Sequence, residues 1–169
     1  MVMKQSVIFS IVLLSIVSIL ASCDFIRDLF PVSKSELTFK ATISKDHPND
    51  TILFTGNDIK SINGTTGEIR FVNSSMISKI KSYHWIKCYL GDDSLFTATV
   101  TLPVVSALIN DLVINLNLND GNFYFGDGYP DWIDNQGASA IRILNKEKRA
   151  PSWIRFIGEL KSEGRYIEK

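Results

Sequence analysis

The chain has 169 residues, of which 45% are hydrophobic and 21% are charged, and its 18 basic side chains balance its 18 acidic ones. This length is sufficient for a domain with a sizeable core. No basic patch or stripe is visible, since Lys146–Arg149 mixes both signs and is interpreted as a solvated helix face. The composition therefore argues against a nucleic-acid partner.

The first 22 residues have the anatomy of a secretory signal peptide. Lys4 precedes an uncharged apolar run from Val7 to Ala21, which ends in small residues. As a helix this run would reach only ~22 Å. The hydrocarbon core of a bilayer is ~30 Å thick, so a removed signal is favoured over a retained membrane anchor.

The end of the run, Leu20-Ala21-Ser22-Cys23, resembles the lipobox of bacterial lipoproteins. The resemblance implies that the Cys23 thiol receives a diacylglyceryl group, that the chain is cut before it, and that the new N-terminus is acylated. Two or more acyl chains hold a protein stably on a membrane. We expect a signal peptide at 1–22, a lipidated N-terminus and tether at 23–36, and a single domain at 37–169. The alternative is cleavage elsewhere, which would leave Cys23 an ordinary thiol.

The first half of the domain has the pattern of strands. Residues 37–44 alternate apolar and polar side chains, as a half-buried strand does, and 47–50 (His-Pro-Asn-Asp) are predicted to form a turn. Residues 51–73 are predicted to contain a hairpin around Gly64–Gly67. Residues 74–83 are predicted to form a short helix, because Ser74 or Ser75 can cap it and apolar residues follow at helical spacing.

Two further hairpins are predicted in the middle of the chain. The first joins 84–90 to 94–102 through Gly91-Asp92-Asp93 and stops at Pro103. Residues 104–111 are predicted to form one or two helical turns. The second hairpin occupies 112–126, where Asp120-Gly121 between alternating segments is a strong hairpin signal.

The C-terminal part has helical spacing. Two helices are predicted, with a break at Arg149-Ala150, Pro151 in the first turn of the second helix, and Gly164 at its end. The predicted fold class is α+β: an antiparallel sheet built from hairpins, with short connecting helices and two C-terminal helices packed on one face.

Motifs for catalysis, metal binding or nucleotide binding are missing from the sequence. His47 and His84 lack the spacing of a zinc site, and no nucleophile elbow, Walker loop or dinucleotide fingerprint occurs. Cys88 lies in an alternating segment and is interpreted as a buried structural thiol, which has no disulfide partner if Cys23 carries lipid. We therefore expect neither a cofactor nor a metal.

One stretch, residues 115–134, combines aromatic and acidic side chains. A calcium loop is disfavoured there because the EF-hand pattern fails at its first and twelfth positions. Flat rings with polar tips can stack on a carbohydrate or peptide. The candidate ligand contacts are Tyr124, Asp127, Tyr129, Asp131 and Trp132. The alternative is that half of these rings belong to the core and that residues 126–131 are a turn.

These observations favour a lipid-anchored, non-catalytic protein of the bacterial cell envelope. It would contact the membrane through lipid on Cys23 and bind a protein, a peptide or a glycan. The alternatives are a structural component of an envelope complex and a hydrolase. The hydrolase would use Asp127 and Asp131, with Asp92 or Asp93, as paired carboxylates, which must lie within ~10 Å of one another.

Overall fold

The structure is a computed structural model that describes residues 35–44, 47–104, 106–132 and 136–169. These residues form one compact unit, Ser35–Lys169. The predicted signal peptide, the lipidation site Cys23 and the tether up to residue 34 lie outside the described residues.

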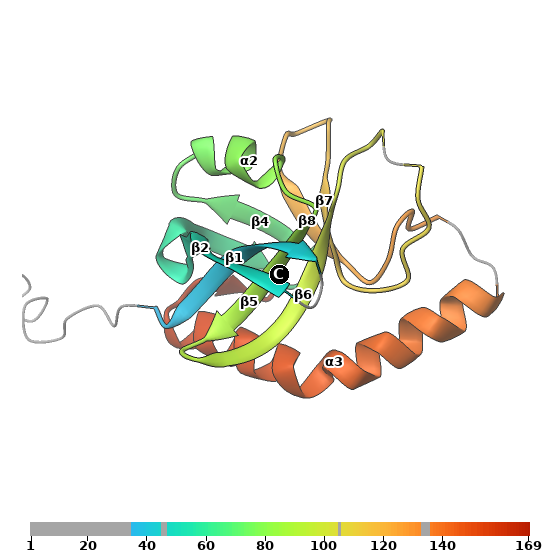
Figure 1. Ribbon diagram of the computed structural model, residues 1–169. Coiled ribbons are helices and arrows are strands. Elements are labelled where there is room, and N and C mark those ends of the chain that lie inside the picture. Colours follow the sequence, from blue (N-terminus) through green and yellow to red (C-terminus); the bar gives the residue numbers. More distant parts are fainter. Residues whose placement is uncertain (1–34, 45–46, 105, 133–135) are drawn as a thin grey trace, which may run out of the picture. The chain divides into compact units, whose positions relative to one another are not determined.

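The described residues form nine strands, two α-helices and a short 3-10 helix. The strands are β1 (Leu37–Ser44), β2 (His47–Thr55), β3 (Ile59–Asn63), β4 (Glu68–Phe71), β5 (Trp85–Leu90), β6 (Asp93–Thr101), β7 (Val113–Leu116), β8 (Phe123–Gly126) and β9 (Tyr166–Ile167). The helices are η1 (Gly56–Asp58), α2 (Ser75–Ile80) and α3 (Gln136–Ser162). Figure 1 shows α3 running across one side of the sheet and α2 on another.

The strands belong to one mixed sheet in the order β2-β1-β5-β6-β7-β8-β4-β3-β9. Two neighbouring pairs, β6–β7 and β3–β9, are parallel, and the other pairs are antiparallel. The prediction of an antiparallel sheet was therefore wrong. Alternation within a strand indicates which face is buried, but it does not identify the neighbouring strand or whether that strand runs parallel or antiparallel. The β3–β9 pair joins segments that are distant in the sequence, whereas β6 and β7 are consecutive strands joined by a crossover.

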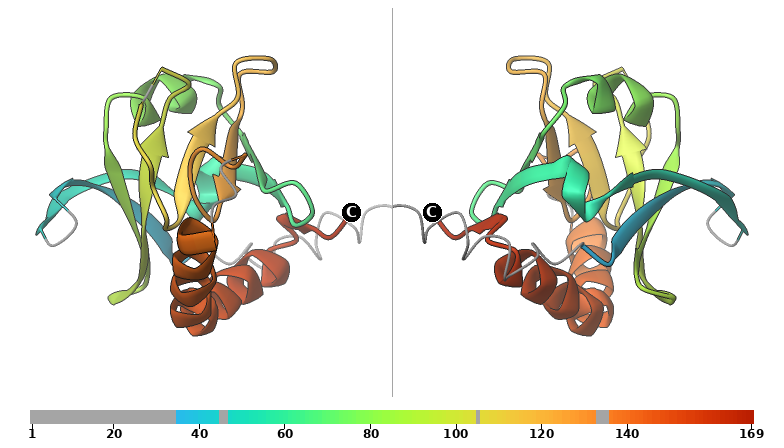
Figure 2. Two further views of the ribbon diagram at one scale, coloured as in Figure 1. Left: turned by 90° about the vertical axis from the view of Figure 1, so that its right-hand side faces the viewer. Right: turned by 90° about the vertical axis from the view of Figure 1, so that its left-hand side faces the viewer.

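The sheet curls into a half-barrel, as two views of the ribbon show (Figure 2). The rings of Phe39 and Phe54 stack with their centroids 4.2 Å apart, and Phe54 meets the Phe71 ring edge-on at 5.3 Å. Phe54 belongs to β2 at one edge of the sheet, whereas Phe71 belongs to β4 near the opposite edge. This contact therefore brings two distant parts of the sheet together over a shared core.

The three predicted hairpins are confirmed. They are β3–β4, β5–β6 and β7–β8, and each is an antiparallel pair. The predicted strand at 37–44 is β1, and the predicted short helix is α2. Gly67 and Gly121 take the positive φ angles of 77° and 73° that their turns require.

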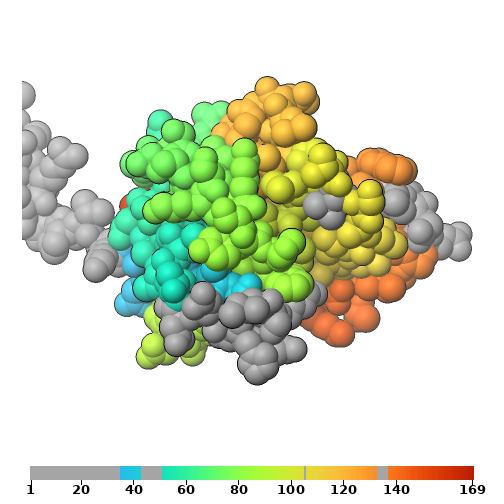
Figure 3. Space-filling view, turned by 45° about the horizontal axis from the view of Figure 1, so that its top comes forward, coloured from blue at the N-terminus to red at the C-terminus, as the bar shows by residue number. Residues whose placement is uncertain are grey.

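Two predictions about connections were wrong. Residues 47–50 are the start of β2, where Pro48 pairs with Thr42, instead of a turn. Pro48 is tolerated because β2 is an edge strand, which needs fewer ladder donors. The described part of 104–111 contains no helix; it crosses over to bring β7 parallel to β6, and Ile109 forms a β-bridge with Tyr129. Figure 3 shows this connection on the surface beside the β7–β8 hairpin.

A single helix, α3, replaces the two C-terminal helices predicted from the sequence. It continues through Arg149 and Ala150 and contains Pro151. Pro151 has no N–H to donate to the carbonyl one turn earlier, but it is exposed, so water can bind that carbonyl instead. Figure 1 shows the helix bending along its length, as proline causes. The predicted end at Gly164 is confirmed, because Gly164 follows the helix with φ 69°.

The core lies between the curled sheet and the C-terminal half of α3. Phe156 is fully buried, and its ring meets Phe96 at 5.1 Å and Phe39 at 6.2 Å. Leu160, one turn later, is also fully buried. Trp153 is partly buried against the same cluster. This half of the helix is therefore fixed by apolar packing.

Candidate functional site

Two neighbouring pockets adjoin the end of β8, and α3 forms part of the wall of the first one only. The first, which we call the helix pocket, is about 350 Å³ in volume and lies between the turn Gly64–Gly67 and the helix. The second, which we call the hairpin pocket, is about 480 Å³ and lies over the β7–β8 hairpin. Thr66, Phe125 and Gly126 line both pockets, so the two share a wall.

The helix pocket combines an apolar wall with a charged edge. Phe125 and Trp153 lie edge to face, with centroids 5.2 Å apart, and both line it. Its edge carries Asp127, Lys146 and Arg149. Aromatic surface beside a few placed polar groups is typical of small-ligand sites.

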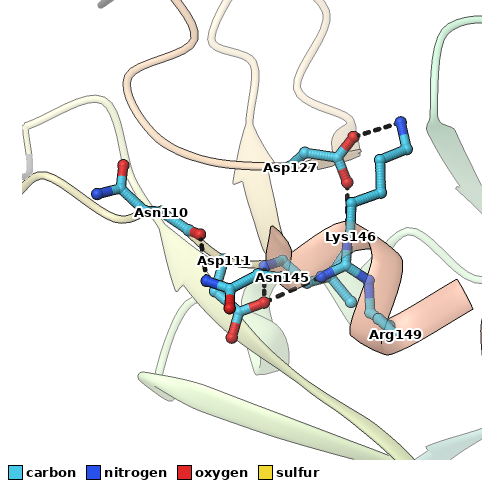
Figure 4. A network of polar contacts seen from close by, with 7 residues as sticks. Asn110, Asp111, Asp127, Asn145, Lys146 and Arg149 are labelled. Carbon is cyan, nitrogen blue, oxygen red and sulfur yellow. Dashed lines mark hydrogen bonds and ion pairs between the residues drawn. The ribbon is translucent and has the colours of Figure 1, made fainter. Parts of the chain in front are cut away.

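The charged edge is an ordered network, shown in Figure 4. Arg149 donates to Asp111 at 2.9 Å and to Asp127 at 2.6 Å, and Lys146 donates to the other carboxylate oxygen of Asp127 at 2.8 Å. The Arg149 side chain is only 9% exposed. Asp111 precedes β7 and Asp127 follows β8, so Arg149 fastens the helix to both strands of the hairpin.

The same face of α3 makes further polar contacts one and two turns earlier. Asn145 donates to the Asn110 carbonyl at 2.8 Å, and Arg142 donates to the Pro130 carbonyl at 2.9 Å. The interpretation of Lys146–Arg149 as a solvated face was therefore wrong for Arg149. The sequence signal that could have identified this polar face is the recurrence of Arg142, Asn145 and Arg149 at helical spacing.

The hairpin pocket collects three of the five residues predicted from the sequence. Tyr124, Tyr129 and Asp131 line it, whereas Asp127 lines the helix pocket. Trp132 is 78% exposed and lines neither pocket. The structure thus gathers four of the predicted residues into two adjoining pockets and leaves Trp132 outside them.

Amide side chains form part of the polar lining of the hairpin pocket, beside Thr66, two tyrosines and Asp131. Asn115, Asn117 and Asn119 all line it. The Asn115 side-chain oxygen accepts a bond from Thr101 at 3.1 Å, and that of Asn117 accepts one from the backbone of Asn119 at 2.9 Å. Their oxygens are thereby fixed in position. The side-chain nitrogens of Asn115 and Asn117 form no hydrogen bond within the described residues.

Tyr124 is held by the hairpin turn beneath it. Its hydroxyl donates a short hydrogen bond to Asp120, whose other oxygen accepts a bond from the Asn122 backbone at 2.9 Å. Donating this hydrogen bond to the Asp120 carboxylate raises the pKa of Tyr124 to about 12. In return, the Tyr124 hydroxyl lowers the pKa of Asp120. Tyr124 therefore keeps its proton and a fixed orientation at the pocket wall.

The carboxylates considered for hydrolysis do not line one common pocket. Asp127 is the only carboxylate among the residues lining the helix pocket, and Asp131 is the only one in the hairpin pocket. Asp93, the first residue of β6, pairs with Arg155 at 2.8 Å. Since Asp127 is bound by two cations, it is arranged as a structural and binding group rather than as an acid or base.

Cys88 is a buried free thiol on β5, as predicted. Burial raises its pKa well above the ordinary value, which disfavours the reactive thiolate. His84 is exposed and precedes the same strand. Among the described residues no cluster of histidine, cysteine and acidic side chains could hold a metal ion.

Comparisons with known proteins give no match to this chain, whether with family models, curated proteins or solved structures. Within the part of the chain that the structure describes, no helix combines the length and the apolar character needed to cross a membrane.

Proposed function

We propose that this chain is a lipid-anchored binding module of the bacterial cell envelope, held by lipid on Cys23, and that its two adjoining pockets bind a glycan. The anchor rests on the lipobox at 20–23. The binding site rests on the shared wall of the helix and hairpin pockets. The role is one of recognition, without a catalytic step.

The chemistry of the pocket walls favours a glycan over a peptide. The hairpin pocket presents amides, tyrosine hydroxyls and one carboxylate, which suit the hydroxyl and acetamido groups of a sugar. The rings of Phe125 and Trp153, which lie edge to face, form an apolar wall of the helix pocket against which the face of a sugar can pack. A peptide bound in extended form would need a free strand edge. Both β7 and β8 are paired on each side within the sheet.

One observation carries the proposal: Phe125 and Gly126 at the end of β8 form the wall between an aromatic pocket and an amide-lined one. A chain of sugar residues has both kinds of surface along its length. The two pockets together therefore suit an oligosaccharide that crosses the end of β8.

Binding is tested by titrating the purified mature protein with oligosaccharides from bacterial envelopes and following the heat of binding. Asp131→Asn and Lys146→Ala each remove one polar group from a pocket edge. Each change should weaken binding about tenfold, because a hydrogen bond to a charged group contributes roughly 1.5–3 kcal/mol. Asp92→Asn and Lys148→Ala are the matched controls, since these side chains are exposed and line neither pocket.

The controls should bind like the unchanged protein. If all four variants bind alike, the glycan does not occupy these pockets. If no oligosaccharide binds while an envelope peptide does so and is weakened by the same two variants, the pockets are a peptide site instead. The anchor is tested separately by mass spectrometry of the natural protein, where an unmodified Cys23 would contradict it.

A further inference from the structure

The outward face of α3 carries large apolar side chains. Ile143 is 59% exposed, Leu144 is 49% exposed and Ile154 is 71% exposed. At about 100° per residue, these three lie within one arc of roughly 120° on the helix surface. Ala140, Ala150 and Pro151 are exposed in the same arc. We call this set of six residues the apolar stripe.

The polarity of the first half of α3 is the reverse of what a surface helix normally shows. Its inner face contacts the domain through Arg142, Asn145 and Arg149. A surface helix of a globular protein usually turns its apolar side chains inward and its charges outward. Here the polar contacts already fix the helix, so the apolar stripe is not needed for the core.

Charge is distributed unevenly between α3 and the rest of the chain. The helix holds six basic and two acidic residues, a net charge of +4, so the remainder of the neutral chain carries −4. Lys146 flanks the stripe on one side, and Lys148 and Arg155 flank it on the other. Lys161 lies within the arc, two turns beyond Ile154. All four are exposed. Glu147 is the one acidic residue within the arc.

From this arrangement we propose that the apolar stripe lies on an anionic bilayer surface, with the flanking lysines and arginine at the lipid headgroups. A basic helix with one apolar face is the usual form of an interfacial helix. The inference rests on the proposed lipid anchor. Twelve residue steps separate Cys23 from Ser35, which limits the domain to within about 40 Å of the anchored lipid. The domain is therefore confined close to the membrane, and its positively charged element suits the anionic surface.

The contact is tested with the mature lipidated protein in vesicles. Ile143→Cys places a probe site in the stripe, and Ser78→Cys places a matched one on the exposed side of α2. Each cysteine carries an environment-sensitive fluorophore, and Cys88 is buried. In vesicles containing phosphatidylglycerol, brominated acyl chains should quench the probe at 143 about threefold more than that at 78, as expected for a group at the acyl boundary.

Charge variants test the orientation. Lys148→Glu should reduce quenching at 143 and Glu147→Gln should increase it, whereas Lys79→Glu on α2 should leave it unchanged. Vesicles of phosphatidylcholine alone should give weaker quenching than anionic ones. Equal quenching at 143 and 78 would overturn the inference. The inference would also be overturned if, in the absence of lipid, the probe at 143 became shielded from water as the protein concentration rose. A second copy of the chain would then cover the stripe.

Failure of the anchor gives a different result from failure of this contact. If the protein stays with the vesicles but the probe at 143 remains unquenched, the anchor stands and the contact of α3 is wrong. If the natural protein carries no lipid and leaves the vesicles, the proposed anchoring fails, and the contact fails with it.

Discussion

The turn Gly64–Gly67 offers a sharp test of how the pocket wall is built. Gly67 and Gly121 both lie in hairpin turns with nearly equal positive φ angles, 77° and 73°. A Cβ atom added at Gly67 would lie 2.5 Å from the backbone oxygen of Phe125, whereas one added at Gly121 would meet nothing within 4 Å. Replacing each glycine by alanine therefore separates the cost of the backbone angle from the cost of the clash.

The two costs can be worked out separately. An alanine in the left-handed region costs about 1–2 kcal/mol, and this applies to both positions. The clash at Gly67 is with backbone, and the Phe125 amide also donates to the Gly67 carbonyl at 2.9 Å, so neither strand can move away freely. Overpacking of this kind adds about 1–3 kcal/mol. We expect Gly121→Ala to lower the free energy of unfolding by about 1–2 kcal/mol and Gly67→Ala to lower it by about 2–5 kcal/mol.

Thermal unfolding followed by circular dichroism measures the difference. For a domain of this size, 1 kcal/mol shifts the melting temperature by about 4 °C, so Gly67→Ala should melt roughly 4–12 °C below Gly121→Ala. It should also weaken oligosaccharide binding, because Phe125 lines both pockets. Equal melting temperatures for the two variants would refute the close packing of Gly67 on Phe125 and the description of the pocket wall that depends on it.

Three more outcomes are expected. Arg149→Met should lower the free energy of unfolding by about 2 kcal/mol, since it removes two charge-assisted hydrogen bonds from a buried side chain. Lys146→Met, at an exposed side chain, should lower it by less than about 0.5 kcal/mol, and chemical denaturation measures both values. Cys88 should react with a thiol reagent only when the protein is unfolded, because burial raises its pKa and excludes the reagent; rapid reaction of the native protein would contradict this. The bond between Tyr124 and Asp120 stabilises the fold fully below pH 10 and is lost as pH rises through about 12. In Asp120→Asn the absorbance of the Tyr124 phenolate should therefore appear at lower pH, near 10, and an unchanged titration would show that the bond does not exist.

The strands were predictable because their signals are local. Alternation marked β1, and Asp120-Gly121 marked the tip of the β7–β8 hairpin. The parallel pairs had no comparable signal. In β3–β9 the partners Ile62 and Tyr166 lie far apart in the sequence, and the crossover between β6 and β7 was predicted to be helical. In β2, Pro48 was interpreted as a turn residue, although an edge strand tolerates it.

The prediction of two C-terminal helices was wrong, whereas part of the candidate site could be predicted from the sequence. A proline at 151 normally ends a helix, but here Arg149 and Trp153 fasten the segments on either side of it to the domain. Tertiary contacts therefore override the local signal. Tyr124, Tyr129 and Asp131 could be found from the sequence because they lie within one short stretch of aromatic and acidic residues. Arg149 could not be found in that way, because its partners lie before β7 and after β8.

Ile154 has a consequence for any affinity measurement on this protein. It lines the helix pocket and also belongs to the apolar stripe. If the proposed sugar binding and the proposed membrane contact both use Ile154, the two equilibria are thermodynamically linked, and the linkage is reciprocal: whatever a sugar does to membrane affinity, lipid does to sugar affinity by the same factor. Dissociation constants obtained in detergent or buffer should differ from those obtained on liposomes.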